Sequence, residues 1–201
     1  MRFRIGGWRR WLLALIGVAV LVALVGYLLP RTARFPDTVA ALAASPAELF
    51  PLLNTREGHR RAWARASERA GARNLPPMTH ADLGGPARGV GTRTCFCLSG
   101  EGLGLVGSLL GPLARGEGVI VESVPHRRVV YEIDWGFMVT RRRFGLEALG
   151  ERRTRVTWSE TVDAANPLVR YLWLASAWFP RFDGVLAAAA DLAAEDRGMA
   201  P

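Results

Sequence analysis

The pattern of apolar and polar residues begins with one long apolar run. Trp11 to Leu29 is a stretch of 19 residues without a charge. About 20 consecutive apolar residues cross the hydrocarbon core of a bilayer as a helix. Trp8 and Trp11 at one end and Tyr27 at the other match the aromatic residues that anchor such helices at the membrane interface. The pattern therefore predicts a transmembrane helix over residues 11–29, preceded by a basic tail at 1–10.

Charges beside this run predict its orientation. Four arginines (Arg2, Arg4, Arg9 and Arg10) precede it, and two (Arg31 and Arg34) follow it. The positive-inside rule then places the N-terminus in the cytoplasm and the rest of the chain outside the cytoplasmic membrane. A cleaved signal peptide is the alternative, but its apolar region is usually about 7–15 residues and ends in a small-x-small site. Leu28-Leu29-Pro30-Arg31 offers no such site, which favours an uncleaved, single-pass anchor.

After a linker at 30–37, the pattern predicts one short strand and two helices. The strand covers Thr38 to Ala43. Ser45-Pro46-Ala47-Glu48 has the cap, the first-turn proline and the third-position acid of a capping box, which predicts a helix over Pro46–Leu53. A second helix is expected over Glu57–Ala70.

The middle of the chain alternates with the period of β-strands. The region 71–91, rich in Pro and Gly, is expected to hold one irregular strand near Met78 to Leu83. Five further strands are predicted, joined in two places by tight turns: Thr92–Ser99, Gly118–Val124, Arg128–Trp135, Val139–Ala148 and Arg153–Val162. Serial strands with tight turns indicate an antiparallel meander.

The last part of the chain changes to helical spacing. Apolar residues recur at this spacing from Leu168 to about Glu195, with a kink or break expected at Pro180. The sequence thus predicts an α+β fold, a curved antiparallel sheet wrapped around a long C-terminal helix. Because the inner face of the sheet must be buried against that helix, a cavity between them is expected. This domain would span 38–195, followed by a tail at 196–201.

Composition adds little to this picture. The 201 residues carry a net charge of +8, and every basic residue is an arginine. These arginines are scattered over predicted strands and loops, so we expect no nucleic-acid partner. Cys95 and Cys97 lie two residues apart, so their side chains point the same way from one strand. They could form a local disulfide or help to bind a metal. The interpretation we favour is that they are two small apolar side chains. The three histidines lie far apart, and we expect neither a metal nor a cofactor.

Three stretches resemble the SRPBCC superfamily, also called the START-like or helix-grip fold, in its polyketide cyclase/dehydrase-type branch. They are Ala44–Phe50, the segment from Gly116 through Val121–Pro125 to Arg128–Tyr131, and Gly150–Trp158, in which Arg155-Val156-Thr157-Trp158 is the most similar part. The resemblance spans residues 38–195, although His59-Arg60-Arg61-Ala62-Trp63 replaces a Trp-Pro-x-Trp stretch common in the family. It implies a hydrophobic ligand cavity, and relatives include lipid carriers, hormone receptors and aromatic cyclases.

Glu160 is the unexpected residue of the predicted sheet. It falls on the apolar face of its strand with Val156, Trp158 and Val162, where an unpartnered carboxylate is costly. If Phe144 lies opposite Trp158 across the hairpin, Arg142 lies opposite Glu160. We therefore predict an Arg142–Glu160 ion pair on the inner face, either as a polar contact for a ligand or as a structural pair at the rim.

The remaining candidate residues are apolar or aromatic. Together with the ion pair, the expected ligand-binding residues are Phe96, Tyr131, Trp135, Arg142, Phe144, Trp158, Glu160 and Trp173. The apolar, Gly-rich stretch 103–113 predicts a contact with the membrane or another protein, with a lid over the pocket and a loop folded over its own core as the alternatives. No catalytic triad order, metal motif or dinucleotide fingerprint is present, so we assign no catalytic residue. The function expected is binding of a small hydrophobic or lipid-like ligand, with a cyclase/dehydratase-like enzyme and a ligand-free interaction module as alternatives.

Overall fold

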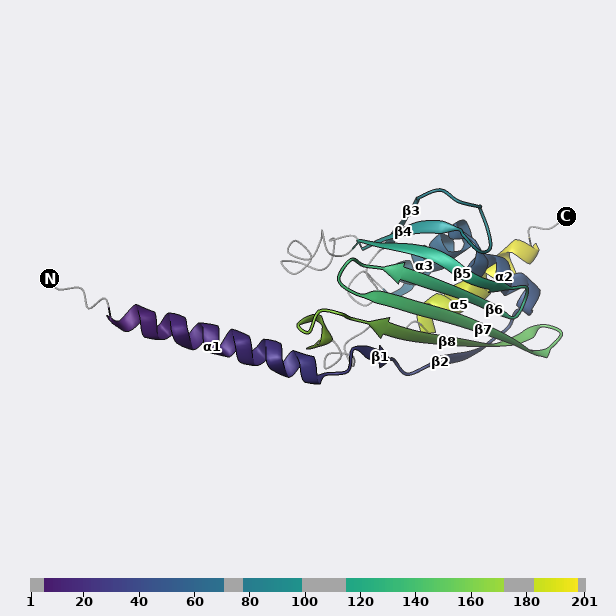
Figure 1. Cartoon of the computed structure of the whole chain (residues 1–201). Coiled ribbons are helices and arrows are strands. Elements are labelled where there is room, and N and C mark those ends of the chain that lie inside the picture. The colour runs from purple at the N-terminus through teal and green to yellow at the C-terminus, as the bar shows by residue number, and fades with distance from the viewer. Residues whose placement is uncertain (1–5, 71–77, 99–114, 172–182, 199–201) are drawn as a thin grey trace.

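A computed structural model describes residues 6–70, 78–98, 115–171 and 183–198 (Figure 1). The chain begins with a long helix, α1 (Gly6–Leu28), which projects from an α+β domain. The domain opens with two short strands and two helices: β1 (Thr32–Arg34), β2 (Thr38–Leu42), α2 (Pro46–Asn54) and α3 (Arg56–Ala70). Six strands and a final helix follow: β3 (Met78–Asp82), β4 (Arg93–Leu98), β5 (Arg115–Val124), β6 (Arg128–Asp134), β7 (Val139–Gly150), β8 (Arg153–Asp163) and α5 (Asp183–Gly198).

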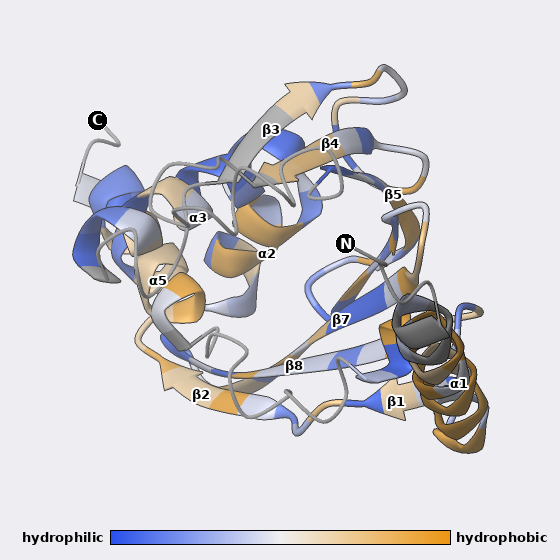
Figure 2. Cartoon of the chain, turned by 90° about the vertical axis from the view of Figure 1, so that its left-hand side faces the viewer, coloured by the Kyte–Doolittle hydropathy of each residue, from blue (hydrophilic) through white to orange (hydrophobic). Residues whose placement is uncertain are grey.

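The strands form one antiparallel sheet in the order β1-β8-β7-β6-β5-β4-β3, and β2 also pairs with β8. Seen along the strands, the sheet curves, and α2, α3 and α5 lie on its concave side (Figure 2). This is the predicted helix-grip architecture. The apolar residues of the concave face are buried against these helices in one core, which includes Phe144, Val156 and Leu186.

The sequence signals at the start of α2 act as predicted. The Ser45 hydroxyl accepts a hydrogen bond from Glu48 N–H, and the Glu48 carboxylate accepts one from Ser45 N–H at 2.6 Å. These contacts lower the pKa of Glu48, mainly through the Ser45 backbone hydrogen bond. The capping box thereby fixes the start of α2.

Helix α1 contains the predicted apolar run. Within the part of the chain that the structure describes, it is the one helix long and apolar enough to cross a bilayer, over Trp11–Leu28. Its large apolar side chains are exposed. The hydropathy colours of Figure 2 show that most of this helix is hydrophobic. It begins at Gly6, five residues before the predicted start.

The segment predicted as a linker is joined to the sheet. Within it, β1 pairs with the end of β8, Thr32 opposite Asp163 and Arg34 opposite Thr161. Arg31 Nε donates to Asp163 Oδ1 at 2.9 Å, and this bond lowers the pKa of Asp163. The chain that follows α1 is therefore paired with β8 and is not a free linker.

Two other expectations need correction. The predicted helix does not begin at Leu168, since residues 169–171 form a 3₁₀ turn, and the described part of the helix is α5 (Asp183–Gly198). The intervening residues, including the proposed kink at Pro180, lie outside the described part. Cys95 and Cys97 are not two free apolar side chains but form a disulfide.

Candidate functional site

Arg142 and Glu160 meet on the concave face of the sheet. The register pairs Phe144 with Trp158 and Arg142 with Glu160, as the hairpin between β7 and β8 predicts. Arg142 Nη2 lies 3.4 Å from Glu160 Oε1, with side chains only 4% and 14% exposed. The carboxylate therefore has a charged partner, which offsets the cost of burying it.

Aromatic rings enclose this ion pair. The Arg142 guanidinium carbon lies 4.8 Å from the centroid of the Trp158 ring and 5.9 Å from that of Phe96. Trp158 Nε1 donates to the second Glu160 oxygen at 3.3 Å. Cation–π contacts strengthen when they are desolvated, so the rings help to hold the buried guanidinium. The result is a polar pair inside an aromatic surround.

Phe96, Tyr131, Phe144 and Trp158 form an aromatic cluster, and His59 packs against it. His59 was not among the predicted site residues. It is buried on α3, with its ring centroid 5.4 Å from Phe96, 5.5 Å from Tyr131 and 6.3 Å from Phe144. The one local signal in the sequence is its spacing from Trp63, four residues later, which places both on one helical face. The contact with the sheet depends on how α3 packs, and no sequence pattern shows that.

Tyr131 closes the cluster beneath α2. Its hydroxyl donates to Leu53 O at 2.7 Å, and both groups are buried. Burial raises the pKa of Tyr131 above its ordinary value, and the nearby Arg142 charge opposes this only in part. The phenol is therefore a neutral hydrogen-bond donor at physiological pH.

The ion pair lies near one end of the sheet, toward α1. Arg142 is three residues from the start of β7, and Glu160 is three from the end of β8. At the same end, Trp135 is partly buried, and its Nε1 donates to Thr140 Oγ1 at 3.1 Å. The polar pair is thus placed between the aromatic cluster and the rim of the concave face.

Seven of the eight predicted ligand residues are therefore described, and all seven lie on this face: Phe96, Tyr131, Trp135, Arg142, Phe144, Trp158 and Glu160. Trp173 and the apolar stretch 103–113 lie outside the described residues.

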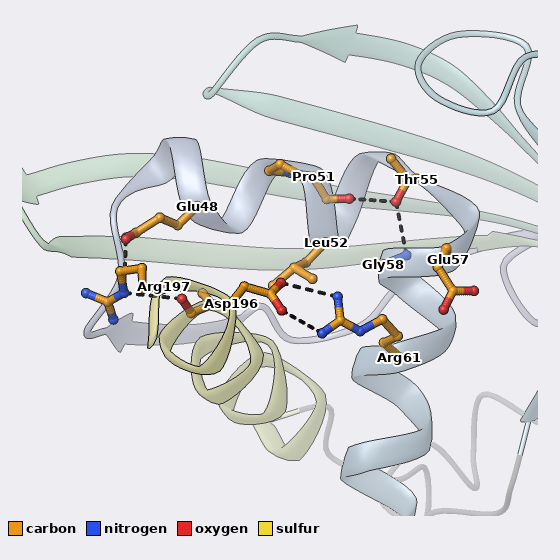
Figure 3. A pocket seen from close by; sticks show the side chains of 10 residues that line it. Glu48, Pro51, Leu52, Thr55, Glu57, Gly58, Arg61, Asp196 and Arg197 are labelled. Atoms are coloured by element: carbon orange, nitrogen blue, oxygen red, sulfur yellow. Dashed lines mark hydrogen bonds and ion pairs between the residues drawn. The ribbon is translucent and has the colours of Figure 1, made fainter. Parts of the chain in front are cut away.

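Two cavities lined by described residues lie elsewhere. One, of about 390 Å³, sits between α2, α3 and α5, where Arg61 pairs with Asp196 and Arg197 pairs with Glu48 (Figure 3). The other, of about 580 Å³, lies between the start of α2 and the hairpins that contain His126 and Glu147. Neither is lined by the seven described residues of the predicted site. No group of three or more His, Cys, Asp or Glu in the described part is arranged to hold a metal.

Comparison of the sequence with protein-family models and with curated proteins gave no match. Solved structures do resemble this one. Truncated norcoclaurine synthase from Thalictrum flavum superposes with a TM-score of 0.51 and 9% identity, covering 85% of this chain and 96% of its own. A Rhodobacter sphaeroides protein gives 0.50 and 19%, covering 82% and 99%. A protein from Arthrobacter aurescens gives 0.50 and 17%, covering 81% and 86%.

At these identities the resemblance concerns the fold. The chain has a helix-grip α+β domain, a class in which a curved antiparallel sheet and helices enclose one concave face. The fold alone does not define a function, because one fold carries many activities.

Proposed function

We propose that this protein is a membrane-anchored helix-grip protein that binds a small apolar or lipid-like ligand at the concave face of its sheet. The observation that carries the proposal is the Arg142–Glu160 pair, which is charged, nearly buried and enclosed by Trp158 and Phe96. Ligand sites of this kind are mostly apolar, with a few polar groups that fix orientation. The apolar part of the ligand would contact the aromatic rings, and its polar end would meet the ion pair near the rim.

The anchor supports a lipid-like ligand. An apolar helix that joins the domain directly would keep the concave face close to a bilayer, where apolar molecules are concentrated. The structural similarity to norcoclaurine synthase shows that this fold also occurs in a protein that is named as an enzyme. Nothing in the arrangement of Arg142, Glu160, His59 and Tyr131 assigns a reaction, so binding is the function that the site supports best.

The test is native mass spectrometry of the full-length protein released from detergent. We expect the wild type to carry a co-purified lipid or aromatic molecule, and Arg142→Ala and Glu160→Ala to lose most of it. Arg143→Ala is the matched control, because Arg143 is the next residue on β7 and is exposed on the opposite face. Near-ultraviolet circular dichroism checks that each variant keeps its aromatic packing.

Each outcome has a distinct meaning. Equal ligand retention in wild type, Arg142→Ala and Glu160→Ala would show that the ion pair is a structural pair and not a ligand contact. A wild type that never carries a ligand would favour the interaction module. A bound molecule that changes mass on incubation would favour the enzyme.

A further inference from the structure

The end of α1 is held by the turn that follows β8. Gly26 packs against Pro167, and a Cβ at Gly26 would lie 2.5 Å from the Pro167 carbonyl oxygen. One turn earlier along α1, the Val22 carbonyl accepts a hydrogen bond from the Tyr171 hydroxyl at 2.5 Å. The turn formed by residues 167–171 therefore lies alongside α1, not beyond its end.

Arg170 fixes this arrangement. Its buried side chain donates to Ala164 O and Ala165 O at 3.0 Å each and to Leu29 O at 3.3 Å. Its guanidinium carbon lies 5.6 Å from the centroid of the Tyr27 ring. The last carbonyls of a helix have no partner within the helix, and a basic side chain is a favourable one. The same cation thus joins the end of α1 to the chain that leaves β8.

The position of these contacts along α1 gives their depth. Val22 precedes Leu28 by six residues, which is roughly 9 Å at a rise of about 1.5 Å per residue. The apolar span Trp11–Leu28 is roughly 27 Å long, close to the ~30 Å hydrocarbon core. Arginines precede and follow the span, so sliding α1 outward to lift Val22 into water would pull charge into the core.

We propose that the turn 167–171 enters the bilayer interface beside α1, and that the lipid surface is the partner of this end of the domain. This inference rests on the proposed membrane anchoring. The exposed side chains suit that environment: Leu168 is 53% exposed, and Tyr27 is exposed beside Arg170. Tyrosine is enriched at headgroup depth in membrane interfaces. The domain therefore rests on the membrane rather than standing away from it.

Depth-dependent quenching tests this proposal in the full-length protein. Leu168→Cys, Leu21→Cys and Val90→Cys are each labelled with a nitrobenzoxadiazole fluorophore, without reduction so that the Cys95–Cys97 disulfide stays closed. The proteins are reconstituted into phosphatidylcholine vesicles with or without a doxyl quencher at acyl carbon 5. All three positions carry exposed apolar side chains. We expect quenching at 168 and 21 several-fold stronger than at 90, which lies between β3 and β4.

The outcomes separate this inference from the anchor itself. Quenching at 21 without quenching at 168 would overturn the inference and leave the anchor in place. No quenching at either position would overturn both.

Two glycine variants then test the contact that holds the turn. Gly26→Leu removes the space for Pro167, whereas Gly17→Leu adds the same side chain where nothing lies within 4 Å. We expect Gly26→Leu to reduce quenching at 168 several-fold, with Gly17→Leu unchanged and quenching at 21 retained in both. Undiminished quenching at 168 in Gly26→Leu would overturn the role of the Gly26–Pro167 contact.

Discussion

Tyr131 shows how a single polar atom is accommodated in the core. Its hydroxyl donates to Leu53 O, a carbonyl near the end of α2, and the pair links sheet to helix. Leaving a buried carbonyl without a donor costs more than the bond itself contributes, because the group also loses its contact with water. The phenol is thus a structural element as well as part of the aromatic cluster.

The raised pKa of Tyr131 predicts behaviour at alkaline pH. Burial favours the neutral phenol in the folded state, so its contribution to stability is fully present below the ordinary pKa near 10 and is lost as pH rises above it. Tyr131→Phe should lower the free energy of unfolding by about 1 kcal/mol at neutral pH, because Leu53 O loses its donor. It should also move the alkaline unfolding transition to higher pH, because no buried phenol remains to ionise.

Circular dichroism of the full chain in detergent, followed through an alkaline titration, measures both effects. Tyr27→Phe is the control, since Tyr27 is exposed. An alkaline transition that Tyr131→Phe leaves in place would show that another group controls it.

Some residues of the site were predictable because strand geometry is local. Alternation assigns Glu160 to the apolar face, and a short hairpin limits the register to a few choices, so Arg142 followed as its partner. His59 was not predictable in this way. Its neighbours Phe96 and Phe144 are set by the packing of α3 on the sheet, which depends on the whole fold.

At the scale of elements, two glycines on β5 make room for the aromatic side chains. A Cβ at Gly118 would lie 2.2 Å from a Phe96 ring carbon, and one at Gly116 would lie 2.8 Å from the Trp135 ring. The Phe96 and Trp135 rings thus occupy the space that side chains at these two positions of β5 would fill. Because small residues hide the alternation, the sequence pattern predicted a strand only from Gly118, whereas β5 also includes Arg115–Glu117.

Gly118→Ala is therefore expected to destabilise the domain. The Phe96 ring must move, and overpacking of this kind costs about 1–3 kcal/mol. Gly145→Ala on β7 is the matched control, because its Cβ would meet nothing closer than 3.9 Å. Urea unfolding of the full chain in detergent compares the two, and equal midpoints would contradict the packing account.

The C-terminal helix shows where periodicity fails. Helical spacing of apolar residues from Leu168 predicts a helix, yet Arg170 and Tyr171 bind carbonyls outside the turn, among them those of α1. The Asn166 side chain accepts from Leu168 N–H at 2.9 Å, as in the start of a helix. The local signal is thus present, and tertiary contacts at 169–171 decide the outcome.

At the scale of the whole molecule, α1 and the candidate site share one end of the domain. β1 follows α1 and pairs with residues 161–163, next to Glu160. Phe35 N–H donates to the Glu160 backbone carbonyl at 2.9 Å, so the chain leaving α1 contacts the site strand directly. With the proposed anchor in a bilayer, a lipid-like ligand would reach the rim of the concave face by a short path from the membrane.

The Cys95–Cys97 disulfide bears on which side of the membrane the domain lies. Disulfides persist in oxidising compartments and are rare in the cytoplasm, so an extracytoplasmic domain stays our prediction. In cells, we expect neither cysteine to be alkylated after denaturation without reduction, and both to be alkylated after reduction, with Cys95→Ser/Cys97→Ser as the unlabelled control. A C-terminal alkaline phosphatase fusion, active only outside the cytoplasm, should be active. Two thiols alkylated without reduction, together with an inactive fusion, would place the domain in the cytoplasm and reverse the orientation derived from the flanking arginines.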